Sequence, residues 1–147
     1  MKIVVDTNIV FSAILNIDSN IAKILINSKN KFDFYSCEFL KNEIYQHKNK
    51  ILKITGYNQS EFLEIEYLVI KNISFLNHKL VGRENLTKAK NILKEIDVND
   101  APFFAMAKHL KAKLWTGDKV LINGLNSFGY KDTITTKGLL NFLKKTD

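Results

Sequence analysis

The sequence is poor in cysteine, proline and arginine. Its 147 residues contain one cysteine and one proline, and a lone cysteine, Cys37, excludes an internal disulfide. We therefore expect a reducing compartment, with Cys37 as a small buried apolar side chain. No apolar run approaches the roughly 20 residues that a membrane-spanning helix needs. Because Asp6 interrupts the apolar N-terminal segment, we also expect no export signal and a cytoplasmic protein without a membrane partner.

Repeats, low-complexity tracts and flexible linkers are missing as well, which predicts a single domain over residues 1–147. A chain of this length can bury a core without disulfides or structural metals. The formal net charge of +7 permits a polyanionic partner such as nucleic acid. The basic residues, however, are almost all lysines, and Asn and Ile are also abundant. This general bias in composition means that the charge by itself indicates no function.

What the sequence does contain is an alternation of short apolar runs with amphipathic segments, which is typical of an α/β domain with a parallel sheet. The predicted strands are Ile3–Val5, Phe32–Ser36, Ile73–Leu76, Ala112–Trp115 and Thr133–Thr135. The predicted helices are Thr7–Leu15, Ser19–Ser28, Glu38–Ile51, Ser60–Val69, Leu86–Ile96 and Lys137–Lys144. One more helix carries Pro102 in its first turn and ends near Leu110, and we expect a loop at His78–Asn85.

Acidic residues gather at one edge of the predicted sheet. Ligand sites of open parallel sheets lie beyond the carboxyl ends of the strands, and five acids fall there: Asp6, Glu43, Asp97, Asp100 and Asp118. Asp6 directly follows a strand, Asp118 lies just past another, and the other three lie near helix N-termini. The remaining acids are expected on solvated helices or turns, at the opposite edge (Asp33 and Asp132), or in the tail (Asp147).

Carboxylates that are forced together repel one another, and burying them without a counter-charge costs several kcal/mol per ion. The segment VVDTN around Asp6 contains no Lys or Arg, and the lysine of GDK alone does not neutralise four or five anions. A hard divalent cation does. Oxygen ligands alone suit Mg²⁺ or Mn²⁺ rather than Zn²⁺, which prefers His and Cys. Such an ion activates water and stabilises charge on a phosphoryl group, so the pattern favours a metal-dependent nuclease.

Each acid also has an ordinary structural interpretation. Asp6 can cap the helix that begins at Thr7, and Asp97 or Asp100 can cap the helix that contains Pro102, a role worth about 1 kcal/mol. Asp118 can be a turn residue, and Glu43 can face solvent. Capping and metal binding are compatible, however, and the convergence of all five acids favours a functional site.

Two further features permit contacts with RNA but have simpler interpretations. His47 lies four residues after Glu43 on the same helix face, and we expect it to be solvated rather than a ligand. The stretch HKNKILK, residues 47–53, suits an RNA backbone or a solvated helix face equally well. The large aromatic side chains are expected in the core rather than stacked on bases: Trp115, Phe103 and Phe104.

Two segments of the sequence resemble PIN-domain ribonucleases. The opening VVDTNIVFSAIL is similar to the start of these domains, in which an Asp ends the first strand, and EIDVNDAPFFAMAKHLKAKLWTGDKVL is similar to their C-terminal half. The similarity covers nearly the whole chain in the family's order and spacing. It implies a Rossmann-like three-layer α/β/α sandwich with sheet order 3-2-1-4-5, in which Asp6 and Asp118 flank the topological switch point.

By position, the resemblance implies a catalytic, metal-binding acidic quartet: Asp6, Glu43, Asp100 and Asp118. The supporting polar residues would be Asp97, Thr116 and Asn8. The implied cofactor is Mg²⁺ or Mn²⁺, and the implied reaction is hydrolysis of RNA phosphodiester bonds. A short PIN protein further implies the toxin of a type II toxin–antitoxin pair, which forms a homodimer and is inhibited by a small antitoxin protein.

Two other classes of function remain open on the sequence. In the first, Asp6 accepts a phosphoryl group, as in aspartate-based phosphotransferases and receiver domains. Haloacid-dehalogenase enzymes, however, have a second Asp two positions on, where this chain has Asn8, and beryllofluoride would label Asp6 only in a phosphotransferase. The second class is a non-catalytic RNA- or protein-binding module on a PIN scaffold. Such a module would bind RNA in EDTA and would not cleave it with Mn²⁺.

Overall fold

The computed structural model describes residues 1–146, so Asp147 lies outside the described residues. The strands are β1 (Lys2–Val5), β2 (Asp33–Cys37), β3 (Ile73–Leu76), β4 (Lys113–Trp115) and β5 (Thr133–Ile134). The α-helices are α1 (Thr7–Leu15), α2 (Asn20–Asn27), α3 (Phe39–Gln46), α4 (Lys48–Thr55), α5 (Gln59–Ile70), α6 (Arg83–Leu93), α7 (Ala101–Leu110), α8 (Lys119–Ser127) and α9 (Thr136–Thr146). Two short 3-10 helices, η1 (His78–Val81) and η2 (Val98–Asp100), precede α6 and α7.

The strands of residues 1–146 form one parallel five-stranded sheet in the order β3-β2-β1-β4-β5, which confirms the predicted order. β1 lies at the centre of the sheet. Its residues Ile3, Val4 and Val5 are completely buried, as expected for an apolar strand that is covered on both faces. The strand order reverses between β1 and β4. The switch point therefore lies at the carboxyl ends of these two strands.

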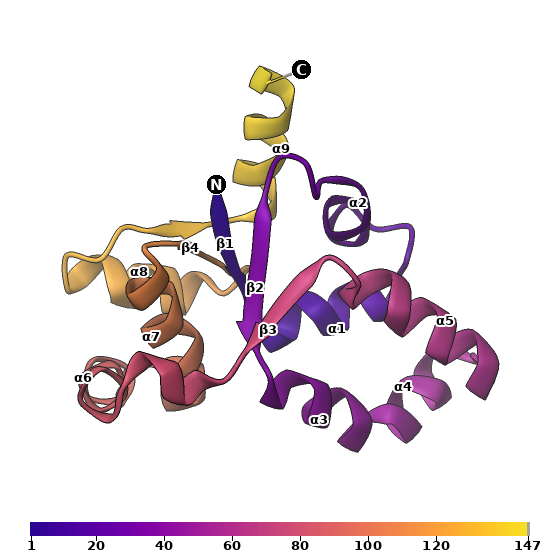
Figure 1. The fold of residues 1–147 in the computed structure, drawn as a ribbon, viewed down its shortest axis with the longest axis horizontal. Coiled ribbons are helices and arrows are strands. Elements are labelled where there is room, and N and C mark those ends of the chain that lie inside the picture. Colours follow the sequence, from indigo (N-terminus) through magenta and orange to yellow (C-terminus); the bar gives the residue numbers. More distant parts are fainter. Residues whose placement is uncertain (147) are drawn as a thin grey trace.

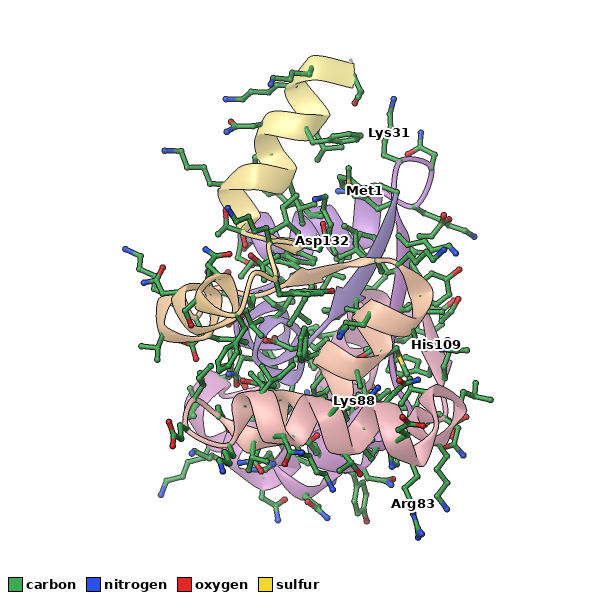
Figure 2. All side chains as sticks on the ribbon, turned by 90° about the vertical axis from the view of Figure 1, so that its left-hand side faces the viewer. Met1, Lys31, Arg83, Lys88, His109 and Asp132 are labelled. Atoms are coloured by element: carbon green, nitrogen blue, oxygen red, sulfur yellow. The ribbon has the colours of Figure 1, made fainter. Side chains whose placement is uncertain are left out.

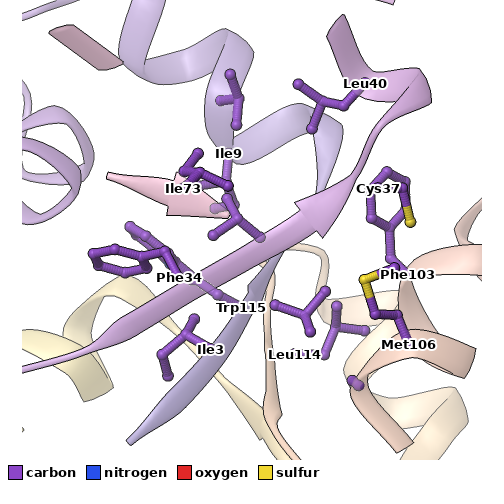
Figure 3. Packing of buried hydrophobic residues seen from close by; sticks show 14 of the residues in the cluster. Ile3, Ile9, Phe34, Cys37, Leu40, Ile73, Phe103, Met106, Leu114 and Trp115 are labelled. Carbon is purple, nitrogen blue, oxygen red and sulfur yellow. The ribbon is translucent and has the colours of Figure 1, made fainter. Parts of the chain in front are cut away.

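Helices cover both faces of the sheet (Figure 1). On one face α7 contacts β1, β2 and β4 and packs against α6, whereas α1, α2 and α5 pack together on the other. On the α7 side, Phe103 and Met106 lie beside Cys37 of β2 (Figure 3), and all three are buried, as are Phe104 and Trp115. The structure thus confirms the three-layer α/β/α class and the predicted core positions of these aromatic residues and of Cys37.

The helix predicted over Glu38–Ile51 is wrong in its continuity, because the chain forms α3 and α4 with a break at His47. His47 has φ −98° and ψ 7°, and its Nδ1 lies 2.9 Å from the Glu43 carbonyl oxygen. Since a carbonyl only accepts, this ring nitrogen donates, and it competes with backbone N–H groups for the acceptor. α4 then continues to Thr55 and ends at Gly56, whose φ of 77° suits glycine.

Two other segments differ from the prediction. The stretch predicted as a loop, His78–Asn85, contains η1 and the first residues of α6. The helix α8 was not predicted, although Leu121 and Leu125 are buried at the spacing of one helix face. Its sequence, KVLINGLNS, contains Gly and Asn, which favour helices weakly, so tertiary packing and a strong N-cap decide its conformation.

Within residues 1–146, no single helix is long and apolar enough to span a membrane. Helices α1 and α2 reach that length and composition only as a pair that is bent by 104°.

Candidate metal centre

The strand register places Asp6 beside Thr116 at the carboxyl edge of the sheet. Val5 pairs with Trp115 in the parallel β1–β4 ladder, so the next residue of each strand leaves the ladder beside the other. Both side chains are buried, with Asp6 4% and Thr116 1% exposed. Ser36 fixes the end of β1, because its hydroxyl donates to the Val5 carbonyl at 2.7 Å. The backbone therefore presents a buried carboxylate next to a buried hydroxyl.

Asp6 is also the N-cap of α1, as the capping interpretation predicted. Its Oδ1 accepts a hydrogen bond from the Ile9 N–H at 3.0 Å. Burial raises the pKa of Asp6 to about 6, and the negative charge of Asp118 adds to this, whereas hydrogen bonds from Ile9, Thr116 and the Asn8 backbone lower it. At neutral pH Asp6 is thus a mostly ionised carboxylate with little access to water.

Asp118 follows β4 and begins α8, so it is a helix cap rather than only the turn residue that the sequence allowed. Its Oδ1 accepts the N–H groups of Val120 at 2.9 Å and Leu121 at 3.2 Å. Both bonds use Oδ1, which leaves Oδ2 to another ligand. The Asp118 N–H donates to the Thr116 hydroxyl at 3.1 Å, and Thr116 lies beside Asp6 at the end of the β1–β4 ladder. Thr116 therefore links the position of Asp118 to that of Asp6.

Asp97 and Asp100 lie just before α7, as predicted, but neither side chain caps α7. Asp97 is instead the N-cap of η2 and accepts the Asn99 N–H at 3.0 Å, whereas the Asp100 side chain makes no capping hydrogen bond. Burial and, after it, the negative charges of Asp6, Asp97 and Asp118 raise the pKa of Asp100 to about 7. Coulomb energies fall with distance, so the negative charges of three other aspartates lie close enough to Asp100 to raise its pKa.

Glu43 joins this edge through Thr7. Helices α1 and α3 are in contact, and the Thr7 hydroxyl donates to Glu43 Oε1 at 3.3 Å. The Glu43 side chain is half-buried, which contradicts its interpretation as a solvent-facing residue. Burial and then the charge of Glu43 raise the pKa of Cys37 to about 12. The charges that act on Asp6 and Asp100 do not include that of Glu43, so this residue belongs to the rim of the acidic group.

Two clefts open over these side chains and meet at Asn8. The first has a volume of about 290 Å³, and its polar lining includes Thr7, Asn8, Glu43, His47, Asp97, Asn99 and Asp100. The second has a volume of about 350 Å³ and is lined in part by Asn8, Thr116, Gly117 and Asp118. Asp6, which precedes Thr7 and lies beside Thr116, is buried between the two clefts. The predicted acids thus reach one edge but divide between adjoining hollows.

Within residues 1–146, no Lys or Arg forms a salt bridge with these acids. The salt bridges among residues 1–146 join Lys88 to Glu84 and Lys113 to Asp132, away from this edge. Nor are three or more His, Cys, Asp or Glu side chains in the described residues already arranged to hold a metal ion. The donors nevertheless suit Mg²⁺ or Mn²⁺, because they are carboxylate oxygens. Carboxylates without a cation repel one another, and Asp100, which no cap bond holds, can turn towards the others.

Two residues that line the first cleft, Thr7 and Asn99, were not predicted from the sequence. Thr7 is adjacent to Asp6, but its bond to Glu43 depends on the packing of α1 against α3, which no local pattern contains. Asn99 lies between Asp97 and Asp100, and this position was its only signal. His47 is exposed, as predicted, yet it lines the same cleft through the break between α3 and α4.

Comparison with known families matches residues 4–142 to the family described as PIN domain. The matched range contains every acid of this edge and the elements that hold them, from β1 to most of α9. No curated protein matches the chain.

Proposed function

Because this chain belongs to the PIN-domain family, whose members are generally nucleases, we propose that it is a divalent-metal-dependent endoribonuclease that hydrolyses RNA phosphodiester bonds. One observation carries this proposal. Asp6, Asp100 and Asp118 lie at the carboxyl edge of the sheet, in or between two adjoining clefts, and no Lys or Arg of residues 1–146 forms a salt bridge with them.

The chain would hold Mg²⁺ or Mn²⁺ through carboxylate oxygens of Asp6, Asp100 and Asp118, with Glu43 at the rim. When bound, such an ion supplies a polarised water near neutral pH and neutralises charge that develops on the phosphate. Without it, Asp100 shares a proton with solvent near pH 7, since its pKa is about 7. Binding of the cation therefore has to release this proton.

The other polar groups of the edge have positioning roles in this proposal. The helix caps hold the Asp6 and Asp118 carboxylates in place before substrate arrives, which reduces the cost of ordering them. Glu43, oriented by Thr7, lines the same cleft as Asp100 and is the carboxylate we assign to accept a proton from the attacking water. Asp97 supports the site through its negative charge at Asp100.

The biological role that we propose is that of a toxin in a type II toxin–antitoxin pair, active as a homodimer and inhibited by a small antitoxin protein. Membership of the PIN-domain family supports the nuclease activity on which this role depends, and the role itself is what the resemblance implies. Expression of the wild-type chain in a bacterium would then arrest growth, and expression of Asp100→Asn would not. Growth arrest by both proteins at equal expression levels would separate toxicity from the acidic site and contradict this role.

RNA cleavage by the purified protein in Mg²⁺ or Mn²⁺ tests the activity. Asn keeps the shape of Asp and the oxygen that caps a helix, but it removes the charge. We expect Asp6→Asn and Asp100→Asn each to lower the cleavage rate by about 100-fold or more, and EDTA to abolish cleavage. Glu64→Gln is the matched control, because Glu64 is an exposed acid on α5, and its cleavage rate should equal that of wild type.

Two outcomes would overturn the proposal. Wild-type rates in both Asn variants would show that these acids do not catalyse cleavage. RNA binding that persists in EDTA, together with no cleavage in Mn²⁺, would instead favour a non-catalytic binding module on the PIN scaffold.

A further inference from the structure

The amino edge of the sheet, opposite the acidic clefts, contains a cavity whose charged lining residues are mostly lysines. It has a volume of about 380 Å³ and lies between the start of β1, the end of α7 and the chain before β5. Its charged side chains are Lys2, Lys108, Lys111, Lys113 and Asp132. Figure 2 faces α6 and α7, and its labels Met1 and Asp132 mark two residues of this lining. We refer to it as the basic cavity.

Lysines are common throughout this chain, but here their charge is concentrated and largely uncompensated. Asp132 pairs with Lys113 at 3.8 Å, and within residues 1–146 no salt bridge engages Lys2, Lys108 or Lys111. A smaller hollow of about 170 Å³ shares Lys108 and adds Lys88 and His109. A concave surface with excess positive charge attracts phosphate groups.

The backbone conformation of Lys111 indicates that this lysine has a role other than ending helix α7. Lys111 has φ 56° and ψ 42°, and it is the one non-glycine residue with positive φ among residues 1–146. Glycine usually occupies this place at a helix end, since a side chain there is strained. Favourable interaction with the helix dipole accounts for basic residues in the last turn, but Lys108 already provides it. A strained residue that lines a cavity points to function.

We propose that the basic cavity binds phosphate groups of an RNA strand at a distance from the site of cleavage. The identity of the polymer rests on the proposed function, whereas the phosphate chemistry rests on the lysines.

The two sites lie at opposite ends of α7, which sets the length of RNA that can reach both. Asp100 immediately precedes α7, and Lys111 immediately follows it. The helix has 10 residues and is therefore about 15 Å long. A dinucleotide in the acidic clefts does not extend that far, so the basic cavity should raise the affinity for long RNA and leave the turnover of dinucleotides unchanged.

Binding of a long single-stranded RNA in EDTA, where cleavage does not occur, tests the proposal. Lys111→Gly removes the charge and relieves the backbone, so we expect Tm to stay equal or rise while the affinity falls about fivefold in about 0.1 M salt, the loss for one phosphate contact. The double variant Lys2→Gln/Lys111→Gly should lose about 25-fold under the same conditions, and the slope of log affinity against log salt should decrease by about 0.7 per contact.

A variant of opposite sign and two charge controls complete the test. Asp132→Asn frees Lys113 from its partner, so it should tighten RNA binding. Lys23→Gln on α2 and Glu64→Gln on α5 change the net charge by the same amounts at exposed positions outside the cavity. We expect both controls to bind RNA with wild-type affinity.

The inference is overturned if Lys111→Gly binds RNA as tightly as wild type, or if Lys23→Gln weakens binding equally, since the latter would show only a general effect of charge. These outcomes are separate from failure of the proposed function. If the wild-type protein does not cleave RNA with Mn²⁺ but the cavity variants lose affinity, the nuclease is wrong and the binding site stands.

Discussion

At the scale of single residues, Asp6 and Asp100 are held in different ways. Asp6 caps α1 through Oδ1, whereas Asp100 has no cap bond. Burial raises the pKa of both above the ordinary value of 3.8, to about 6 and about 7. A raised folded-state pKa means that the folded chain binds protons more tightly than the unfolded chain. The resulting stability is present below about pH 4 and is lost as the pH rises through 6 and 7 in the metal-free protein.

Replacement of Asp100 by Asn should therefore stabilise the metal-free protein at alkaline pH while it abolishes cleavage. Because Asp100 is only partly buried, solvent screening limits the gain to about 1 kcal/mol, or a Tm increase of about 2–4 °C. Thermal unfolding at a pH above that pKa, in EDTA, measures this increase, and Glu64→Gln should leave Tm unchanged. A lower Tm for Asp100→Asn would mean that the carboxylate stabilises the fold.

Cleavage should become slower as the pH falls, since protons on Asp100 and then on Asp6 compete with the metal. At limiting Mn²⁺ we expect kcat/KM to decrease about tenfold per pH unit below pH 7 and more steeply below pH 6. Higher Mn²⁺ concentrations should move the profile to lower pH. A profile that does not respond to the Mn²⁺ concentration would exclude these two carboxylates as the titrating ligands.

At the scale of elements, Asp118 serves both the helix α8 and the candidate metal centre, and substitutions can separate the two roles. Asn and Ser preserve a capping oxygen, so Asp118→Asn and Asp118→Ser should keep the free energy of unfolding near that of wild type, whereas Asp118→Ala should lose about 1 kcal/mol. All three variants should lose metal-dependent cleavage. Urea unfolding and the cleavage assay measure the two effects. If Asp118→Ser cleaved RNA at the wild-type rate, Asp118 would act only as a helix cap and not as a metal ligand.

The elements that could be predicted from the sequence are those whose burial follows from composition. Ile3, Val4 and Val5 form an uninterrupted apolar run, which suits a central parallel strand, and Pro102 in a first turn located α7. The break at His47 was not predictable, because it depends on a side chain that bonds a backbone carbonyl. α8 was missed for a related reason, since its N-cap and packing outweigh a weak local helix preference.

The candidate site was predictable to the same extent. The rule that parallel strands share a carboxyl edge selected the five acids, and the structure brings them to that edge. The near-complete burial of Asp6 and the accumulation of negative charge at Asp100 depend on distances between elements that are remote in sequence. The bond from Thr7 to Glu43 depends on the contact of α1 with α3 in the same way. Sequence patterns contain neither kind of information.

At the scale of the whole molecule, charge is divided between the two edges of the sheet. The carboxyl edge carries aspartates at the start of α7, and the amino edge carries lysines at its end. This division follows the dipole of α7, which favours anions at the N-terminus and cations at the C-terminus. The acidic edge exceeds what a helix dipole needs, because Asp6, Asp97 and Asp118 add to Asp100. A divalent cation would neutralise this excess of negative charge.

Binding of Mn²⁺ to the purified protein, measured by electron paramagnetic resonance of the free ion slightly above neutral pH, tests that neutralisation most directly. We expect wild type and Glu64→Gln to bind Mn²⁺ and release protons, and Asp100→Asn to bind at least about tenfold more weakly. Equal Mn²⁺ affinity in wild type and Asp100→Asn, or no binding by the wild-type protein, would contradict a metal centre at this edge of the sheet.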